Sequence, residues 1–290
     1  MFSRILVATD LSQAFERVVC ALSGLRKLGT TEVVLLYCLN IRDVGTLAPG
    51  LMELTKAPLE NQKKLMEEQG FHVTAKMVLG LPHIEISRQA DEQDCSLIVV
   101  GSHGRTMASE ILLGGVASAV IQSVTRPVLI VHLRLKDEGG KTVCEEVTCD
   151  PANHVLFATD FSDIAERAFS YVEQIVQSGS RRVTILHVQD KGRIYGDLKQ
   201  KIDEFNRIDR ERLESMERRL KEAGATEVSI ELPYGLPKQE IVQRLDRGDL
   251  SLIVMGTQGR GFFGKLLMGS VAYHVTRNTS VPTMLIPPLR

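Results

Sequence analysis

The 290 residues exceed the usual length of a single domain and fit two domains of ordinary size. Hydrophobic residues make up 43% of the chain and charged residues 24%, a balance that excludes a disordered chain and predicts a core in each half. Lys and Arg total 35 against 36 Asp and Glu, so there is no global positive charge to attract nucleic acid or an anionic membrane.

Short β-branched runs alternate with amphipathic stretches, which is typical of parallel sheets with crossover helices. The predicted strands of the first half cover residues 3–9, 32–39, 72–78, 96–100 and 128–132, and those of the second half cover residues 154–159, 182–188, 226–232, 251–255 and 283–286. The second-half helices are predicted at residues 165–177, about 196–223, 238–245 and 269–277. We therefore predict an α/β fold with two tandem five-stranded domains, at residues 1–135 and 151–290, joined by a polar linker at 136–150.

The long helix at residues 196–223 has apolar side chains on one side and charges elsewhere. This pattern is typical of an ordinary surface helix, so we interpret its charges as a solvated face rather than a binding patch.

The start of the chain, MFSRILVATD, has no long apolar stretch, and the longest near-apolar run, residues 111–121, is too short to cross a bilayer. We therefore expect a cytoplasmic protein without a membrane partner. The five cysteines are an odd set without a Cys-x-x-Cys pair, which predicts reduced thiols. Cys144 and Cys149 lie close together and could pair or bind a metal, but no nearby residues supply the other ligands of a zinc site.

The two halves repeat one another. ILVATDLS at residues 5–12 returns as VLFATDFS at 155–162, a shift of 150 residues. LGLP at 79–82 matches YGLP at 234–237, and SLIVVGSHGR at 96–105 matches SLIVMGTQGR at 251–260, both at a shift of 155. The fold is therefore duplicated, and the second half has gained five residues, most simply in the charged segment after Val188.

Ligands of open parallel sheets bind at the carboxyl ends of the strands, where the strand order reverses. The loop after the fourth strand of the second half runs from Gly256 to Gly259, and nine residues later Gly269 and Ser270 open a helix. Glycines allow the backbone to approach a ligand closely, and free amides at a helix start bind phosphate oxygens. This loop predicts a nucleotide site.

The spacing G-x-x-G, nine residues, G-[S/T] is similar to the ATP-binding signature of the universal stress protein family. The resemblance includes the ATD start of each half, LHV at residues 186–188 and VP at 281–282, so it spans nearly the whole chain. It implies two Rossmann-like domains of the adenine nucleotide alpha hydrolase-like type. The implied ligand is ATP or AMP, and Mg²⁺ could accompany ATP.

The resemblance implies that Asp160 and the backbone of Val188 hold the nucleoside end of the ligand. The other motif residues would line the ribose and phosphates, with Gly269, Ser270 and Val271 receiving the phosphates and Gly256 and Gly259 lining the path to them. Arg260 adds positive charge. On the residues alone, Asp160 could instead cap the following helix, and either loop glycine could simply form a turn.

The first half keeps the same spacing in a degenerate form, at Gly101, Gly104 and Gly114, but Gly115 stands where Ser or Thr is expected. Asp10 and Arg105 remain, whereas acidic Glu110 replaces Lys265. We expect a weakened or altered site there.

Residues 259–266 also read G-x-x-x-x-G-K-L, which resembles a P-loop but lacks the hydroxyl that binds magnesium, so we interpret this match as a decoy. His103 has Gln258 as its counterpart, and sequence identifies no partner for His187 or His274. We therefore predict no catalytic residue.

These observations predict an adenine-nucleotide-dependent binding module that serves a regulatory or stress response through an unknown protein partner. Two alternatives stay open: a slow ATPase or nucleotidyl-transfer enzyme on the same fold, and an interaction module with vestigial pockets. The apolar final strands predict that the two halves pair through them. A homodimer is compatible with the sequence, which offers no residue-level argument for it.

Overall fold

The computed structural model describes residues 2–12, 15–44, 48–102, 113–132, 135–138, 141–144, 150–194, 201–259 and 268–289. Two compact units make up the chain: one comprises Met1–Asp150 with Leu289–Arg290, and the other comprises Pro151–Pro288. Among the helices of these described ranges, none combines the length and the hydropathy needed to cross a bilayer.

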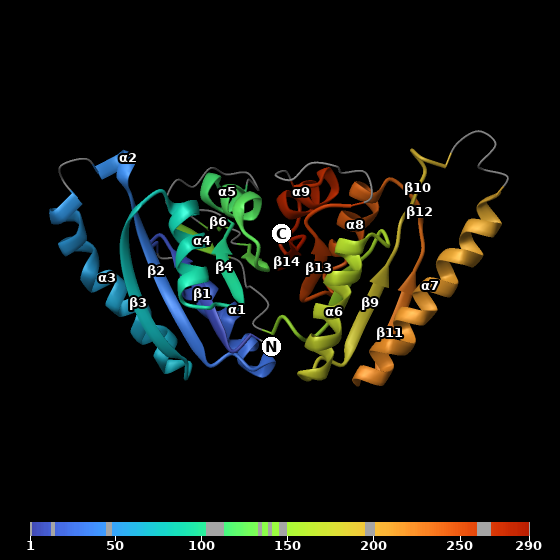
Figure 1. The fold of residues 1–290 in the computed structure, drawn as a ribbon, viewed down its shortest axis with the longest axis horizontal. Helices are drawn as coiled ribbons and strands as arrows, with labels where there is room; N and C mark the ends of the chain where they lie inside the picture. Colours follow the sequence, from blue (N-terminus) through green and yellow to red (C-terminus); the bar gives the residue numbers. More distant parts are fainter. Residues whose placement is uncertain are drawn as a thin grey trace. The chain divides into compact units, whose positions relative to one another are not determined.

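The first unit contains a five-stranded parallel sheet in the order β5-β4-β1-β2-β3 (Figure 1). Its strands are β1 (Arg4–Thr9), β2 (Glu32–Asn40), β3 (His72–Gly80), β4 (Leu97–Gly101) and β5 (Val128–Val131). Its helices are α1 (Phe15–Ser23), η1 (Gly24–Leu28), α2 (Ile41–Val44), α3 (Ala48–Glu68), α4 (Pro82–Glu92) and α5 (Gly115–Ser123). The polar segment that follows contains an antiparallel hairpin of β6 (Leu135–Glu138) and β7 (Lys141–Cys144).

The second unit repeats this topology in the order β11-β9-β8-β13-β14. Its sheet consists of β8 (Val155–Ala158), β9 (Arg182–Leu186), β11 (Glu227–Glu231), β13 (Leu252–Gly256) and β14 (Thr283–Ile286). Its helices are α6 (Asp163–Gln177), α7 (Ile202–Ala223), α8 (Pro237–Leu245) and α9 (Ser270–Arg277). The prediction of an α/β fold with two tandem Rossmann-like domains of five parallel strands is confirmed.

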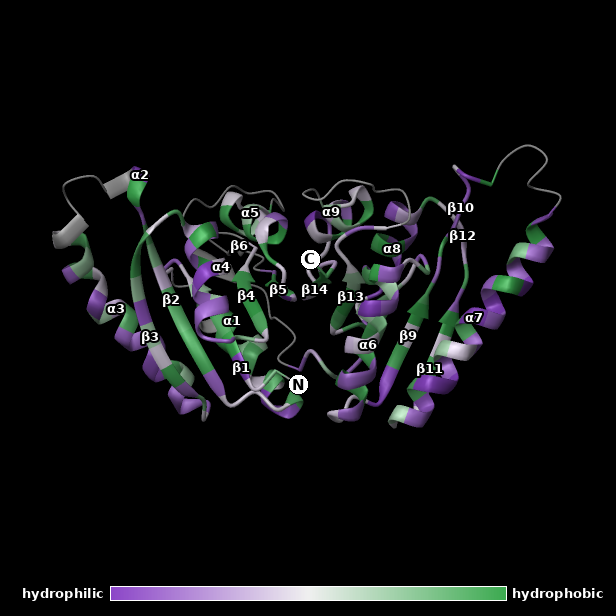
Figure 2. Ribbon diagram, viewed as in Figure 1, coloured by the Kyte–Doolittle hydropathy of each residue, from purple (hydrophilic) through white to green (hydrophobic). Residues whose placement is uncertain are grey.

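Helices cover both faces of the second sheet. Helix α6 packs with α7, and α8 packs with α9. Because crossovers between parallel strands are right-handed and the strand order reverses at β8, the two pairs lie on opposite faces. Strands β8, β13 and β14 are accordingly apolar for most of their length and buried on both sides, and Figure 2 shows the largely hydrophobic colouring of β13. Helix α7 buries Leu213, Met216 and Leu220 and turns its charged side outward.

The second strand of the second unit ends early, at a position that bears on the site. Strand β9 ends at Leu186 instead of residue 188, and the chain resumes pairing only in the short ladder of β10 (Gln189–Asp190) with β12 (Tyr234–Gly235). Pro233 lies at the break, and a proline has no N–H to donate to a ladder. The equivalent strand pair of the first unit has Val78 at this position and runs unbroken to Gly80.

The expectation of reduced thiols is wrong for Cys20, which is disulfide-bonded. Cys38 and Cys95 are free. Burial raises the pKa of each of these two thiols to about 11, so neither is poised to act as a thiolate. The side chains of Cys144 and Cys149 lie outside the described residues. Spacing along the chain cannot tell which cysteines the fold brings together, and for this reason the bond of Cys20 escaped prediction.

Candidate functional site

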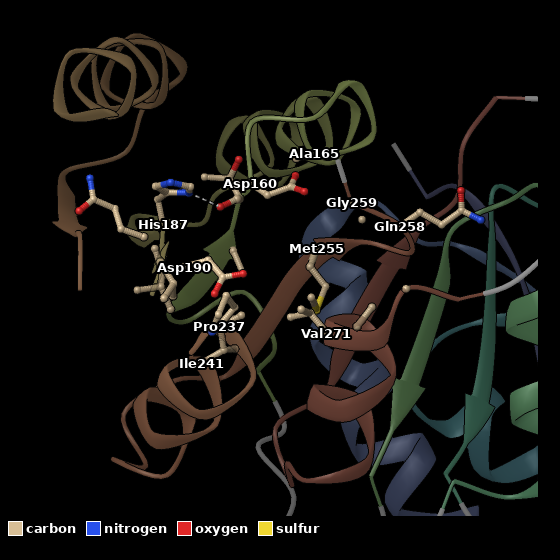
Figure 3. A pocket seen from close by; sticks show the side chains of 18 of the residues that line it. Asp160, Ala165, His187, Asp190, Pro237, Ile241, Met255, Gln258, Gly259 and Val271 are labelled. Atoms are coloured by element: carbon tan, nitrogen blue, oxygen red, sulfur yellow. Dashed lines mark hydrogen bonds between the residues drawn. The ribbon is translucent and has the colours of Figure 1, made fainter. Parts of the chain in front are cut away.

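The second unit contains a cavity of about 860 Å³ at the carboxyl ends of β8, β9 and β13 (Figure 3). This volume falls within the range of about 300–1,000 Å³ that is usual for small-molecule sites. The sequence-predicted residues of this half that line it are Asp160, Val188, Gly256, Gly259, Gly269, Ser270 and Val271. Arg260 lies outside the described residues. The fold thus brings seven residues, from the segments that follow the three strands β8, β9 and β13, into one cavity at the sheet edge.

Asp160 is oriented by a tight turn after β8. The N–H of Phe161 donates to Thr159 Oγ1 at 3.0 Å, and the N–H of Ser162 donates to Asp160 Oδ1 at 3.1 Å. Phe161 takes a left-handed backbone conformation with φ of 58°, which is uncommon for a bulky residue. The cap of α6 is Ser162, whose hydroxyl accepts the N–H of Ala165, so Asp160 does not serve as the helix cap that its position alone allowed.

The loop glycines approach their neighbours too closely for a side chain. A Cβ on Gly256 would lie 2.8 Å from Ile164 Cγ2 and 3.1 Å from the carbonyl oxygen of Gln258. A Cβ on Gly259 would lie against Asp160 Oδ2. Gly256 therefore packs closely on Ile164 and on its own loop, and Gly259 packs closely on the Asp160 carboxylate, while neither glycine has a positive φ.

Helix α9 begins at the cavity with exposed backbone donors. Gly269 is its N-cap residue, in an extended conformation and without a side-chain cap, and its own N–H donates to the carbonyl of Thr257 at 2.7 Å. The first N–H groups of a helix have no partner within the helix, and the helix dipole makes this end positive. Ser270 and Val271 therefore present backbone donors, with the Ser270 hydroxyl beside them, to an anionic group.

The peptide of Val188 forms a hydrogen-bonding edge at the opposite side of the cavity. Successive residues of a strand direct their peptide groups to alternate sides. Leu186 accepts from Thr159 on the β8 side, whereas His187 and Gln189 donate to Glu231 and Pro233 on the other side. The N–H and C=O of Val188 therefore point to the side on which β8 has already ended, and within the described residues they make no backbone hydrogen bond.

Helix α7 also lines the cavity, which the sequence analysis missed. Phe205, Ile208, Asp209 and Arg212 face it, at the spacing of one helix side. Asp209 and Arg212 interrupt the apolar side of this helix, and these two polar residues were the signal that could have predicted its contact with a ligand site. Gln189 Nε2 donates to Asp209 Oδ2 at 3.2 Å.

His187 has partners that the sequence did not reveal. Its Nδ1 donates to the carbonyl oxygen of Thr159 at 2.8 Å, and its Nε2 lies 3.6 Å from Asp209 Oδ2. Its ring stacks on Phe161 with a centroid separation of 4.4 Å. These contacts connect β9, the Asp160 turn and α7.

The first unit repeats the backbone of this site. Leu11 has φ of 61°, and its N–H donates to Thr9 Oγ1 at 3.0 Å, while Ser12 N–H donates to Asp10 Oδ1 at 3.0 Å. Gly101 ends β4. Gly114 is the N-cap residue of α5, and its N–H donates to Ser102 O at 2.7 Å, as in the second unit.

Three of the first-unit differences concern side chains. Gly115 opens α5 without a hydroxyl, at an exposed position. Gln62 of α3 accepts a hydrogen bond from Thr9 Oγ1 at 2.6 Å, a contact that ties the turn to this helix. Cys38 aligns with Val188. Gly104, Arg105 and Glu110 lie outside the described residues, as does Lys265 of the second unit.

Within the described ranges of both units, no group of three or more His, Cys, Asp or Glu residues is arranged to hold a metal ion.

The chain resembles known proteins over both units. The model of the universal stress protein family matches residues 1–132 and again residues 151–287. Universal stress protein MJ0577 of Methanocaldococcus jannaschii is 32% identical over 154 residues, which cover 45% of this chain and 95% of that protein. Universal stress protein Rv2005c of Mycobacterium tuberculosis is 25% identical over 225 residues, which cover 73% of this chain and 68% of that protein.

A solved structure supports the tandem arrangement of the fold. The crystal structure of a universal stress protein from Archaeoglobus fulgidus is 24% identical, and the match covers 99% of both chains with a TM-score of 0.76. At this identity the likeness concerns the fold alone. Since the family model matches each half separately and leaves only the linker and the final residues unmatched, the chain belongs to the universal stress protein family and contains two of its domains.

Proposed function

We propose that the second unit binds an adenine nucleotide, ATP or AMP, and that the protein acts as a nucleotide-dependent binding module in a regulatory or stress response. One observation carries the proposal: a single cavity combines the uncapped start of α9, the glycine loop, the Asp160 carboxylate and the Val188 peptide edge. The start of α9 and the glycine loop, which follow β13, suit phosphates. Asp160 after β8 suits a sugar, and the Val188 peptide after β9 suits a base.

The walls of the cavity fit a purine. Pro237 and Ile241 of α8 lie on one side, Met255 of β13 lies between, and Phe205 and Ile208 of α7 lie on the other side. Small-molecule sites combine such apolar walls with a few placed polar groups. A base between the two helices would bury its faces on apolar side chains and leave its edge for Val188.

Magnesium would enter with ATP rather than occupy a site of its own. Proteins bind Mg²⁺ through one or two carboxylates together with substrate phosphates. Asp160 is the carboxylate that lies against the glycine loop, where the phosphates would pass. The Asp160 carboxylate would then hold such an ion together with the phosphates.

The test is a calorimetric titration of the full chain with ATP, AMP and adenosine, with and without Mg²⁺. We expect saturable binding of both nucleotides and weaker binding of adenosine, because the α9 start contributes only when phosphates are present. A parallel measurement of released phosphate distinguishes the alternative of a slow ATPase or nucleotidyl-transfer enzyme. If none of the three ligands binds, the proposal is wrong, and the alternative of an interaction module with vestigial pockets is favoured.

A further inference from the structure

The Asp209 carboxylate lies beside the side chains of Gln189 and His187, at the end of the cavity where the base of a nucleotide would bind. Its Oδ2 lies 3.2 Å from Gln189 Nε2 and 3.6 Å from His187 Nε2. His187 and Gln189 flank Val188 in the chain, and residues two apart on an extended segment project to the same side. The Asp209 carboxylate therefore lies above the Val188 peptide, on the side covered by α7.

The position of Asp209 is fixed and largely removed from solvent. Only 16% of its side chain is exposed. Gln189, which holds it, is 3% exposed and belongs to the β10–β12 ladder. A carboxylate offers about four acceptor positions, and Gln189 uses one of them. The remaining capacity faces the cavity, where the other lining residues of α7 are the apolar Phe205 and Ile208 and the basic Arg212.

We propose that Asp209 is a specificity-determining residue that selects a nucleotide whose base carries an exocyclic amino group next to the Val188 edge. The inference rests on the proposed nucleotide binding and adds the recognition of the base. The amino group of adenine has two N–H donors. The Val188 carbonyl accepts one and the Asp209 carboxylate accepts the other. A 6-oxo purine presents an acceptor at the same point, toward the negative charge of Asp209.

The experiment compares AMP with purine riboside 5′-monophosphate, which lacks the 6-amino group, by calorimetric titration of the full chain. A hydrogen bond to a charged group makes the parent favour AMP by about 10- to 100-fold. Asp209→Ala should lower the affinity for AMP by that factor and leave the affinity for the 6-unsubstituted nucleotide unchanged. Asp203→Ala is the matched control, because Asp203 lies on the same helix, is exposed and is not part of the cavity lining.

A second variant separates recognition from support of the fold. Asp209→Asn keeps the shape of the side chain and can donate an N–H to the 6-oxo group of IMP. The ratio of the affinities for AMP and IMP should therefore fall about tenfold or more. A loss of affinity that is equal for all three nucleotides in either variant, or an unchanged preference in both, overturns the role of Asp209. A parent protein that binds none of the nucleotides overturns the proposed function itself.

Discussion

Gly259 and Asp160, 99 positions apart in the sequence, pack so closely that a side chain at residue 259 would collide with the Asp160 carboxylate. The backbone of Gly259 does not have a positive φ, so the demand for glycine at this position comes from the neighbour and not from the conformation. The glycine loop after β13 and the turn after β8 are therefore one structural feature, joined at the centre of the cavity.

Gly259→Ala should displace the Asp160 carboxylate and weaken nucleotide binding by about tenfold or more, because the lost contacts involve a charged group. Thermal stability should change little, since the site faces the cavity. Gly50→Ala is the control: Gly50 is exposed on α3, and a Cβ there meets no described atom within 4 Å. In an Asp160→Ala background the same substitution at 259 should cost little, and additive losses would show that the two residues act separately.

Arg244→Met should destabilise the second unit by about 2 kcal/mol, because it removes a buried guanidinium that bonds two partly exposed carboxylates. The Arg244 side chain is 7% exposed and donates to both oxygens of Asp249, at 2.6 and 3.0 Å, and to Glu231 at 2.7 Å. Arg207→Met, which removes an exposed i,i+4 pair with Glu211, should cost about 0.5 kcal/mol or less. Urea unfolding of both variants provides the measurement, and equal small losses would contradict the prediction.

His154 should make the second unit less stable in mild acid. Burial lowers the pKa of His154 below its ordinary value of 6.5, and the backbone hydrogen bond of Asp249 opposes this shift only in part. The ring donates from Nδ1 to Asp249 O at 2.9 Å, and its neutral Nε2 accepts from Thr184 Oγ1 at 2.9 Å.

In the unfolded chain the ring binds a proton first as the pH falls, so the unfolded state is favoured. The contribution of His154 is fully present above pH 6.5 and is lost as the pH falls through the lowered folded pKa. Urea unfolding of the parent and of His154→Gln between about pH 8 and pH 5 checks this linkage. The parent should lose more free energy of unfolding over that window than the variant, and parallel curves would refute the assignment.

The repeat and the glycine spacing were sufficient to predict the ten main strands and the edge of the sheet that holds the cavity, because both depend on local pattern. The break after Leu186 was not predictable from the β propensity of residues 182–188, since it depends on Pro233, which lies between β11 and β12. The role of α7 also escaped, because periodicity gives the faces of a helix but not how far it extends beyond the sheet. The pairing of the two halves through their final strands stays a prediction.

The last prediction concerns the residues that open the two equivalent helices. Gly114 and Gly269 are N-cap residues with closely similar φ and ψ, and each N–H donates at 2.7 Å to the loop before it. The next residue is Ser270 in the second unit and Gly115 in the first, so a hydroxyl distinguishes the two helix starts. Ser270→Ala should therefore weaken ATP binding by about 10- to 100-fold and leave adenosine binding unchanged.

Gly115→Ser should restore part of that affinity in the first unit. Gly115 does not have a positive φ, and a Cβ there meets no atom of the described residues within 4 Å, so the fold has room for the serine. The substitution is best measured in the full chain that already carries Ser270→Ala, because the tight site of the second unit is then weakened and a gain in the first unit becomes visible. Calorimetric titration with ATP, AMP and adenosine should show a phosphate-dependent gain. A Ser270→Ala protein that binds ATP as the parent does would instead mean that the backbone amides of α9 hold the phosphates without help from the hydroxyl.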